Sequence, residues 1–250
     1  MQRLGQHFIQ DAAALKKMAR SLALADGETV IEIGPGHGEL TGELTKAADG
    51  IQIIAIEKDK TLADVLVMDG VQVVNADVLE ALAPEAARHT SYKLAGNIPY
   101  YITGYLLRTI GELKNKPSLA VLMMQKEVAE RIVAEPPKMN RLAASVQFWA
   151  EPSIVGIVKK ESFMPRPLVD SAILLLQTKN GVPPAIESQY YRALHAIFAQ
   201  PRKTLANNLA AALKDKEKCI AAMEECGLDP KCRPQNLTIA QIAVLAKSLF

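Results

Sequence analysis

Cysteine is scarce in this sequence, and its placement argues against two common uses of the residue. The 250 residues include only three cysteines, all near the C-terminus: Cys219, Cys226 and Cys232. The count is odd, no CxxC pair occurs, and the nearest histidine is His195, so neither a disulfide framework nor a zinc site is expected. We therefore expect reduced thiols, no metal ion and a cytoplasmic protein.

Long apolar runs and a strong charge of one sign are also lacking. No stretch approaches the roughly 20 apolar residues that cross a membrane, and residues 1–10 contain no apolar segment typical of a secretory signal. The formal net charge is only +2, but it is uneven, with −1 over residues 1–180 and +3 over residues 181–250. A mildly basic C-terminal part suits an anionic partner, although so small an offset is weak evidence alone.

Apolar residues make up 49% of the chain, and up to about Leu176 they come in short runs that alternate with helical patterns. The expected strands are rich in Val, Ile and Leu, as buried parallel strands are, and cover residues 29–33, 51–57, 71–77, 92–96 and 119–124. The expected helices between them cover residues 39–47, 60–67, 102–113 and 127–134. This alternation predicts an α/β fold with a doubly wound, mostly parallel, Rossmann-like sheet. Two later runs without a helix between them, residues 154–158 and 171–177, predict an antiparallel hairpin at the sheet edge.

The last quarter of the chain differs in pattern. Residues 178–185 contain Asn180-Gly181 and Pro183-Pro184, which are typical of a linker. Residues 187–250 are rich in Ala, Leu, Lys and Glu at helical spacing. We therefore expect two domains, residues 1–180 with the sheet and residues 181–250 with a small group of helices.

A glycine-rich loop, residues 32–41, follows the first expected strand and opens a helix. Such glycines let a ligand approach the backbone closely, although an ordinary tight turn is the alternative. Gly34, Gly36 and Gly38 are spaced as GxGxG, and the dinucleotide pattern GxGxxG fails because Glu39 follows. Glu32 and Glu39 flank the loop. They would repel a pyrophosphate, but they suit the sulfonium and ammonium groups of S-adenosylmethionine.

Acidic residues also end the second and third expected strands. Glu57 lies 23 residues after Gly34, and an acidic residue at about this distance accepts hydrogen bonds from ribose hydroxyls. Asp77 is placed to accept a hydrogen bond from an adenine amino group. For either residue alone, an ordinary solvated carboxylate at a strand end is the alternative. Acids at successive strand ends of one sheet, where ligands of open α/β sheets bind, predict a nucleoside site.

The tetrapeptide Asn97-Ile98-Pro99-Tyr100 follows the fourth expected strand. The Asn97 side-chain oxygen and the Ile98 carbonyl are candidate acceptors for the two N–H bonds of an aromatic amine, and Pro99 stiffens the loop between them. Tyr100 offers a flat face on which a splayed-out base stacks. The chemistry predicted is in-line methyl transfer without a strong general base. An ordinary turn with Tyr100 in the core is the alternative.

These motifs occur in the order found in the rRNA adenine dimethyltransferases, which this sequence resembles nearly end to end, and most closely those of the bacterial small subunit. The matching segments are residues 5–9, 32–41, 57, 77, 97–100, 125–131, 163–171, 198–209 and 235–238. The resemblance implies a class I methyltransferase sheet, a C-terminal helical domain that binds RNA or the ribosome, and dimethylation of two adjacent adenosines near the 3′ end of 16S rRNA. Cofactor contacts to S-adenosylmethionine are expected at His7, Ile9, Gly34, Gly36, Glu57, Asp77 and Asn97.

Three positions depart from the family pattern: His7 stands where Asn is usual, Asn140 where Gly is usual, and Pro201 where Arg or Gln is common. Phe163 is a second candidate for stacking on the target base, with core packing equally open. The candidate RNA contacts are all basic: Lys126, Arg131, Lys159, Lys160, Arg166, Arg202 and Lys203. Folded RNA is recognised mainly by shape and phosphate contacts, so a spread basic face suffices. We expect a monomer that acts on small-subunit rRNA or the 30S particle.

Three other functions remain open on the sequence alone. One is methylation of a large-subunit (23S) rRNA adenine, the antibiotic-resistance activity of relatives with nearly the same core motifs. Another is a non-catalytic ribosome assembly factor on the same fold, against which the intact Asn97–Tyr100 motif argues. The third is a dinucleotide oxidoreductase, which the glycine spacing disfavours.

Overall fold

The computed structural model describes residues 7–179 and 184–250. The chain forms two compact units. The first comprises the residues up to Glu130 together with Glu151–Thr178, and the second comprises Arg131–Ala150 together with Lys179–Phe250. The junction between Thr178 and Lys179 lies close to the boundary expected at residue 180, and the segment Arg131–Ala150 groups with the C-terminal helices as well.

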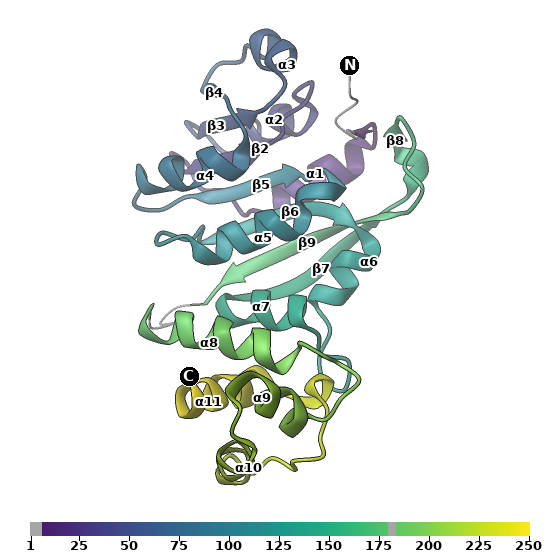
Figure 1. Cartoon of the computed structure of the whole chain (residues 1–250). Coiled ribbons are helices and arrows are strands. Elements are labelled where there is room, and N and C mark those ends of the chain that lie inside the picture. Colours follow the sequence, from purple (N-terminus) through teal and green to yellow (C-terminus); the bar gives the residue numbers. More distant parts are fainter. Residues whose placement is uncertain (1–6, 180–183) are drawn as a thin grey trace. The chain divides into compact units, whose positions relative to one another are not determined.

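The first unit is built on one twisted sheet of seven strands in the order β4-β3-β2-β5-β6-β9-β7 (Figure 1). The strands are β2 (Thr29–Ile33), β3 (Gln52–Glu57), β4 (Val71–Asn75), β5 (Lys93–Asn97), β6 (Leu119–Gln125), β7 (Ala150–Val158) and β9 (Ser171–Thr178). All the strands expected from the apolar runs are present. The first five form parallel pairs, whereas β9 runs antiparallel to β6 and has β7 on its other side. The predicted mostly parallel sheet with an antiparallel edge is confirmed.

The register of the parallel strands places their carboxyl ends at one edge of the sheet. Ile33 at the end of β2 is opposite both Ile56 of β3 and Gly96 of β5. Glu57, the last residue of β3, is opposite Asn75 of β4. The loops that follow these four strands, which contain the glycines and the polar motifs, therefore emerge side by side.

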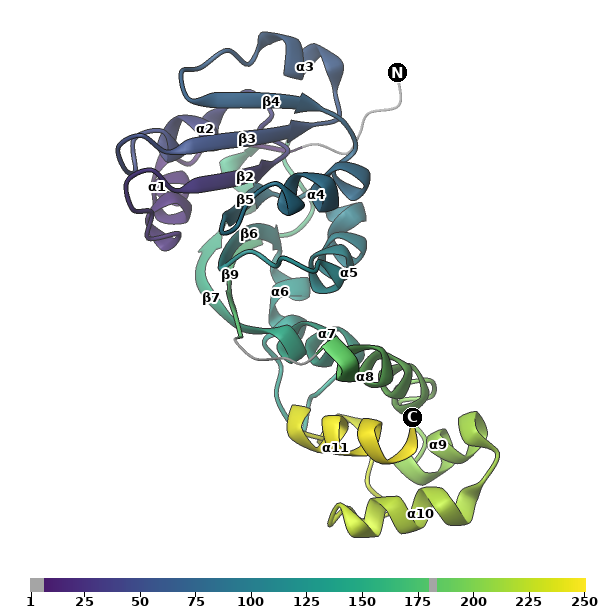
Figure 2. The ribbon, with the colours of Figure 1, turned by 90° about the vertical axis from the view of Figure 1, so that its left-hand side faces the viewer.

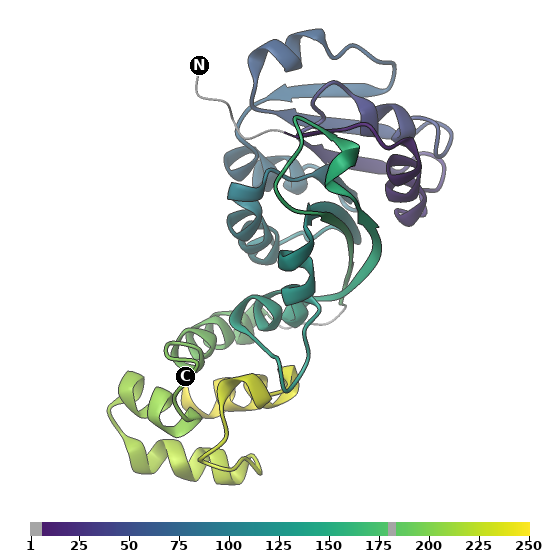
Figure 3. The same cartoon turned by 90° about the vertical axis from the view of Figure 1, so that its right-hand side faces the viewer.

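Helices cover both faces of this sheet, with α1 and α2 on one side and α4 and α5 on the other (Figures 2 and 3). The helices of this part of the chain are α1 (Ala12–Ser21), α2 (Glu39–Leu44), α3 (Lys60–Val65), α4 (Val78–Ala87), α5 (Thr103–Glu112) and α6 (Lys126–Ile132). The sequence analysis did not identify α1 or α4. Both begin at an aspartate that caps the first turn: Asp11 accepts hydrogen bonds from two backbone amides of α1, and Asp77 accepts one from α4.

A two-stranded antiparallel sheet joins two distant parts of the first unit, and it was not predicted either. The strand β1 (Phe8–Ile9) pairs with β8 (Phe163–Met164), with Ile9 opposite Phe163. The backbone amide of Gln10 donates to the carbonyl of Ser162 over 2.7 Å. Because strands of two residues carry no periodic pattern, the sequence could not reveal this pairing.

The second unit is helical, as expected for its C-terminal part. It contains α7 (Arg141–Trp149), α8 (Pro184–Ile197), α9 (Leu205–Leu213), α10 (Lys216–Glu225) and α11 (Ile239–Leu249). Thr204, Asp215 and Thr238 cap the last three, and Thr238 forms a capping box with Gln241. Of the expected linker, residues 180–183 lie outside the described part of the chain.

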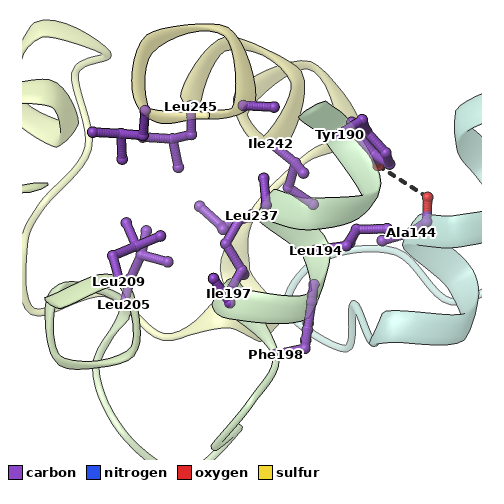
Figure 4. Close-up of a cluster of buried hydrophobic side chains, with 14 of the residues drawn as sticks. Ala144, Tyr190, Leu194, Ile197, Phe198, Leu205, Leu209, Leu237, Ile242 and Leu245 are labelled. Carbon is purple, nitrogen blue, oxygen red and sulfur yellow. Dashed lines mark hydrogen bonds between the residues drawn. The ribbon is translucent and has the colours of Figure 1, made fainter. Parts of the chain in front are cut away.

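Apolar side chains from these helices share one core, as the close-up in Figure 4 shows. The rings of Phe148 and Tyr190 stack with centroids 3.8 Å apart. The Tyr190 hydroxyl donates to the carbonyl of Ala144 over 2.9 Å. Through these contacts α7 is anchored to α8, which explains why α7 belongs to this unit.

Candidate active site

A cavity of about 310 Å³ lies at the carboxyl edge of the parallel strands. Its walls come from β1, from the loops after β2, β3, β4 and β5, and from Phe163 of β8, all within the first unit. The residues predicted for the cofactor and for the reaction all line it: His7, Ile9, Gly34, Gly36, Glu57, Asp77, Asn97, Ile98, Pro99, Tyr100 and Phe163. Residues distant in sequence are thus brought to one place.

The glycine loop forms the floor of the cavity beside β1. Gly36 has φ +60°, in the region that favours glycine. A β-carbon at this position would come within 3.0 Å of the Phe8 ring. The backbone amide of Gly36 donates to Glu57 Oε2 over 3.2 Å, and the amide of Asp59 donates to Glu57 Oε1 over 2.8 Å. The Glu57 carboxylate is therefore held still at the strand end, with further lone pairs left for a ligand.

Glu32 was expected to flank the glycine loop and to suit the cations of S-adenosylmethionine, but it was not among the expected cofactor contacts. Its side chain lines the cavity and is 1% exposed, and neither carboxylate oxygen has a hydrogen-bond partner of normal geometry among the described residues, although the nearby Thr41 hydroxyl partly offsets the rise in its pKa. Burial, with the charges of Glu39 and Glu57 nearby, raises the pKa of Glu32 to about 8. A buried carboxylate without a partner is costly, so this position favours a cationic ligand group.

Asp77 occupies the predicted position but already has two partners. Its Oδ1 accepts from the amide of Leu79 over 3.0 Å, and its Oδ2 accepts from the Lys58 ammonium over 2.7 Å. The Lys58 ammonium holds the pKa of Asp77 below its usual range. Lys58 was not foreseen, because nothing in the sequence connects residues on neighbouring strand ends. Its side chain is 54% exposed, so the ion pair is solvated and weak.

The start of the loop after β5 is held by two hydrogen bonds. The amide of Ile98 donates to the carbonyl of Met123 over 2.9 Å, which continues the strand pairing. The Asn97 side chain donates from Nδ2 to the carbonyl of His7 over 2.9 Å. A carbonyl accepts only, so the NH₂ group must face His7. This leaves Oδ1 of Asn97 as the acceptor on a side chain that lines the cavity.

Tyr100 is positioned by its hydroxyl and by its neighbours. The hydroxyl is 3.0 Å from Ser171 Oγ, a buried group at the start of β9. The His7 ring lies 5.6 Å from the Tyr100 ring at a tilt of 35°. His7 Nδ1 is 2.7 Å from the carbonyl of Pro165, so this nitrogen carries a hydrogen. The histidine that replaces the family's usual asparagine therefore links β1 to the segment after β8.

Phe163 has features of both roles considered for it, packing in the core and stacking on the target base. It is 3% exposed and belongs to the apolar cluster that includes Ile9, which argues for core packing. It also lines the cavity together with Tyr100.

The basic residues expected to contact RNA are divided between the two units. Within the first unit three of them have acidic partners: Lys126 pairs with Glu130 at 3.7 Å, Lys159 with Asp170 at 3.1 Å, and Arg166 with Glu161. Arg131, Arg202 and Lys203 belong to the second unit and are exposed. Lys160 lies in a short 3₁₀ turn beside Lys159 and is partly exposed. A phosphate that reached the paired residues would compete with a carboxylate.

Of the departures from the family pattern, Asn140 has a local structural role. Asn140 caps α7, where its Oδ1 accepts from the amide of Ala143 over 3.0 Å. Its Nδ2 donates to the carbonyl of Arg131 over 2.8 Å. Pro201 lies exposed in the turn before α9. Asn140 therefore makes contacts that glycine cannot.

Two further features bear on the type of site. Over residues 7–179 and 184–250, no three His, Cys, Asp or Glu side chains are grouped as metal ligands. Among the helices of the same residues, none is long and apolar enough to cross a membrane.

The strand order, the antiparallel β9 and the cavity at the carboxyl edge define a class I methyltransferase fold. Within this class the chain belongs to the ribosomal RNA adenine dimethylase family, whose model matches residues 1–249. A curated relative from Dehalococcoides mccartyi, named ribosomal RNA small subunit methyltransferase A, is 37% identical over 255 residues, which span 97% of this chain and 86% of the relative.

Two solved structures share the fold over nearly the whole chain. A dimethyladenosine transferase from Plasmodium falciparum superposes with a TM-score of 0.81 at 24% identity, covering 96% of each chain. The 23S rRNA methyltransferase ErmE superposes with a TM-score of 0.76 at 26% identity, covering 97% of this chain and 99% of the other. The second, helical unit is therefore also part of the shared architecture.

Proposed function

We propose that this protein transfers methyl groups from S-adenosylmethionine to the 6-amino groups of two adjacent adenosines near the 3′ end of 16S rRNA. The observation that carries the proposal is the anchored amide of Asn97, whose acceptor oxygen is left for the cavity. The small-subunit name of a relative at 37% identity supports the choice of substrate. Modification of this kind takes place during maturation of the small ribosomal subunit.

The cavity fits S-adenosylmethionine on three observations. Glu32 offers a buried carboxylate without a partner to the ammonium or sulfonium charge, and the match is electrostatic. Glu57 offers acceptor lone pairs to the ribose hydroxyls from a fixed position. Asp77 accepts a hydrogen bond from the adenine amino group. Lys58 can move aside for this contact, because its ion pair with Asp77 is solvated. His7, Ile9, Gly34 and Gly36 close the site with backbone and apolar surface.

The chemistry needs little acid–base assistance from the protein. Bound S-adenosylmethionine supplies a methyl group on a positively charged sulfur, and no metal ion takes part. Asn97 Oδ1 and the Ile98 carbonyl accept hydrogen bonds from the target amine and favour the tetrahedral nitrogen that presents a lone pair. Tyr100 stacks on the base, and Phe163 closes the opposite side. The protein's contribution is positioning and fixed dipoles.

The partner is the small-subunit rRNA within a 30S particle, in the cytoplasm. Basic side chains of both units make phosphate contacts that need no base recognition. They are Arg131, Arg202 and Lys203 of the second unit and Lys126 and Arg166 of the first. We also propose that the protein acts as a monomer.

A comparison of the two ribosomal subunits as substrates tests the proposal. Labelled S-adenosylmethionine is incubated with the protein and with unmethylated small or large subunits, and label in each rRNA is counted. Label in 16S rRNA alone supports the proposal. Label in 23S rRNA alone would assign the large-subunit activity. Cofactor binding without label in either RNA would favour a non-catalytic assembly factor.

A further inference from the structure

One exposed face of α1 carries three positive charges that no acidic side chain neutralises. Lys16 and Lys17 lie four and three residues before Arg20, so each of them shares a helix face with Arg20, and all three are exposed. The other face of the helix, including Leu15 and Met18, is buried. In the described part of the chain, none of the three cations forms an ion pair or a side-chain hydrogen bond.

This pattern differs from that of other cations on or beside helices of the first unit. Lys60 pairs with Asp64 and Arg108 with Glu112, each at i,i+4, and Lys46 pairs with Glu43 at i,i+3. By contrast α1, with the sequence AAALKKMARS, contains no acidic residue. Like charges one turn apart, as Lys16 and Arg20 are, destabilise a helix. The basic face of α1, defined by Lys16, Lys17 and Arg20, therefore carries a mutual repulsion that no carboxylate among the described residues neutralises.

The basic face of α1 extends away from the candidate active site. α1 begins three residues after Ile9, which lines the cavity, and leads to β2, whose far end carries Gly34. Because Thr29 at the start of β2 lies at the opposite edge of the sheet, α1 runs from the cavity edge back to that edge. Lys16 is thus nearer to the cavity than Arg20 is. The row suits a chain molecule that enters the cavity at one point and continues along the surface.

The side chains around the basic face of α1 favour phosphate groups over a membrane surface as its partner. The neighbouring exposed positions on α1 are alanines, and a shallow hollow is lined by Ala13, Lys16, Lys17, Arg20 and Ser21. A membrane surface would need large apolar side chains beside the charges, and this face has none. Small side chains next to unpaired cations leave room for phosphate groups.

We infer that the basic face of α1 binds phosphates of the RNA backbone next to the target nucleotide. The inference rests on the proposed function, since it takes rRNA as the substrate. It adds RNA contacts at cations that were not among those expected from the sequence and that have no carboxylate partner among the described residues. These contacts carry no base information; they strengthen binding and fix the direction in which the RNA leaves the cavity.

The test uses a triple variant, K16Q/K17Q/R20Q, because glutamine removes the charge and keeps helix propensity. The matched control, K46Q/K60Q/R108Q, removes three positive charges that have acidic partners. Binding of wild type and both variants to unmethylated small subunits is measured as a function of potassium chloride concentration. Each lost phosphate contact lowers the slope of log affinity against log salt by about 0.7–0.9, so the triple variant should lose about two units or more. Its KM for the subunit should rise while kcat and S-adenosylmethionine affinity stay unchanged.

Two outcomes overturn the inference, and they are distinguishable. If wild type methylates small-subunit RNA but the triple variant keeps the wild-type salt slope and KM, or loses no more than the control does, the basic face of α1 does not bind RNA. If wild type itself transfers no methyl group to this RNA, the proposed function fails and the inference fails with it. Thermal unfolding of both variants shows whether either is merely misfolded.

Discussion

The side-chain amide of Asn97 donates a hydrogen bond to the main-chain carbonyl of His7 over 2.9 Å, across 90 residues of sequence. This contact joins the loop after β5 to β1, which covers the cavity. It also determines which end of the amide faces the substrate. The reactive geometry therefore depends on two segments, and a change at Asn97 affects both.

Substitutions at Asn97 should separate its donor from its acceptor. Asn97→Asp keeps an acceptor oxygen but cannot donate to His7, and Asn97→Ala loses both groups. We expect both variants to lower kcat for methyl transfer by about 10²-fold or more, as loss of a fixed dipole at a reacting centre does. Quench-flow or steady-state measurement of labelled methyl transfer checks this. Near wild-type turnover of Asn97→Asp would show that the hydrogen bond to His7 is not needed.

Glu32 predicts an unusual pH dependence of stability in the ligand-free protein. Its pKa is raised from 4.5 to about 8, so the folded state retains a proton that the unfolded state releases. Stability should therefore fall as the pH rises from about 4.5 to about 8, and level off above that. In Glu32→Gln this fall should be reduced, as measured by urea unfolding at several pH values. A fall of the same size in the variant would mean that Glu32 is not its source.

The same variant should bind the cofactor poorly. Glutamine at position 32 has no negative charge to offer to the cations of S-adenosylmethionine. Calorimetry above about pH 8, where the wild-type carboxyl is ionised in the free protein, should show an affinity at least about tenfold lower in the variant. Sinefungin, which keeps an amine in place of the sulfonium, makes a useful second ligand. Unchanged affinity for both ligands would place their charged groups away from Glu32.

Tyr100 should contribute mainly through its ring. Tyr100→Phe loses the contact to Ser171 but keeps the flat face, whereas Tyr100→Ala loses the stacking surface. Base stacking on an aromatic ring contributes about 1–3 kcal/mol. We therefore expect kcat/KM for the RNA to fall roughly fivefold to 150-fold in Tyr100→Ala and much less in Tyr100→Phe. Equal losses in the two variants would assign the effect to the hydroxyl instead.

The core of the second unit offers a stability test away from the cavity. Tyr190→Phe removes the hydroxyl that bonds to the carbonyl of Ala144, and it leaves that buried acceptor without this partner. A loss of about 1–3 kcal/mol in the free energy of unfolding is expected. Chemical denaturation measures it. S-adenosylmethionine affinity should stay at the wild-type value, since none of the described residues of the second unit lines the cavity.

Much of the sheet could be predicted because buried parallel strands are apolar throughout, and they therefore appear in the sequence as short apolar runs. The glycine loop, Glu57, Asp77 and the Asn97–Tyr100 motif also reached the cavity together, since parallel strands must end at one edge. The pairing of Phe8–Ile9 with Phe163–Met164 could not be predicted, because it joins two-residue strands across more than 150 residues. Pairings between side chains of different strands, such as Lys58 with Asp77, depend on register and distance that no local pattern contains.

α7 illustrates a different limit. No helix was expected over its residues, and no local pattern tells which of the two cores its apolar face joins. That choice is made by the stacking of Phe148 on Tyr190 and by the hydrogen bond to Ala144. Glu32 was likewise visible as an acidic neighbour of the glycine loop, while its isolation from any partner became apparent only in three dimensions.

The most direct test of the central claim maps the modified nucleotides themselves. Wild type and Asn97→Ala are each incubated with S-adenosylmethionine and unmethylated small subunits, and the 16S rRNA is digested and read by mass spectrometry. The account predicts dimethyladenosine at two adjacent positions near the 3′ end with wild type and none with the variant. Methylation at any other base or atom, or equal methylation by the variant, would contradict it.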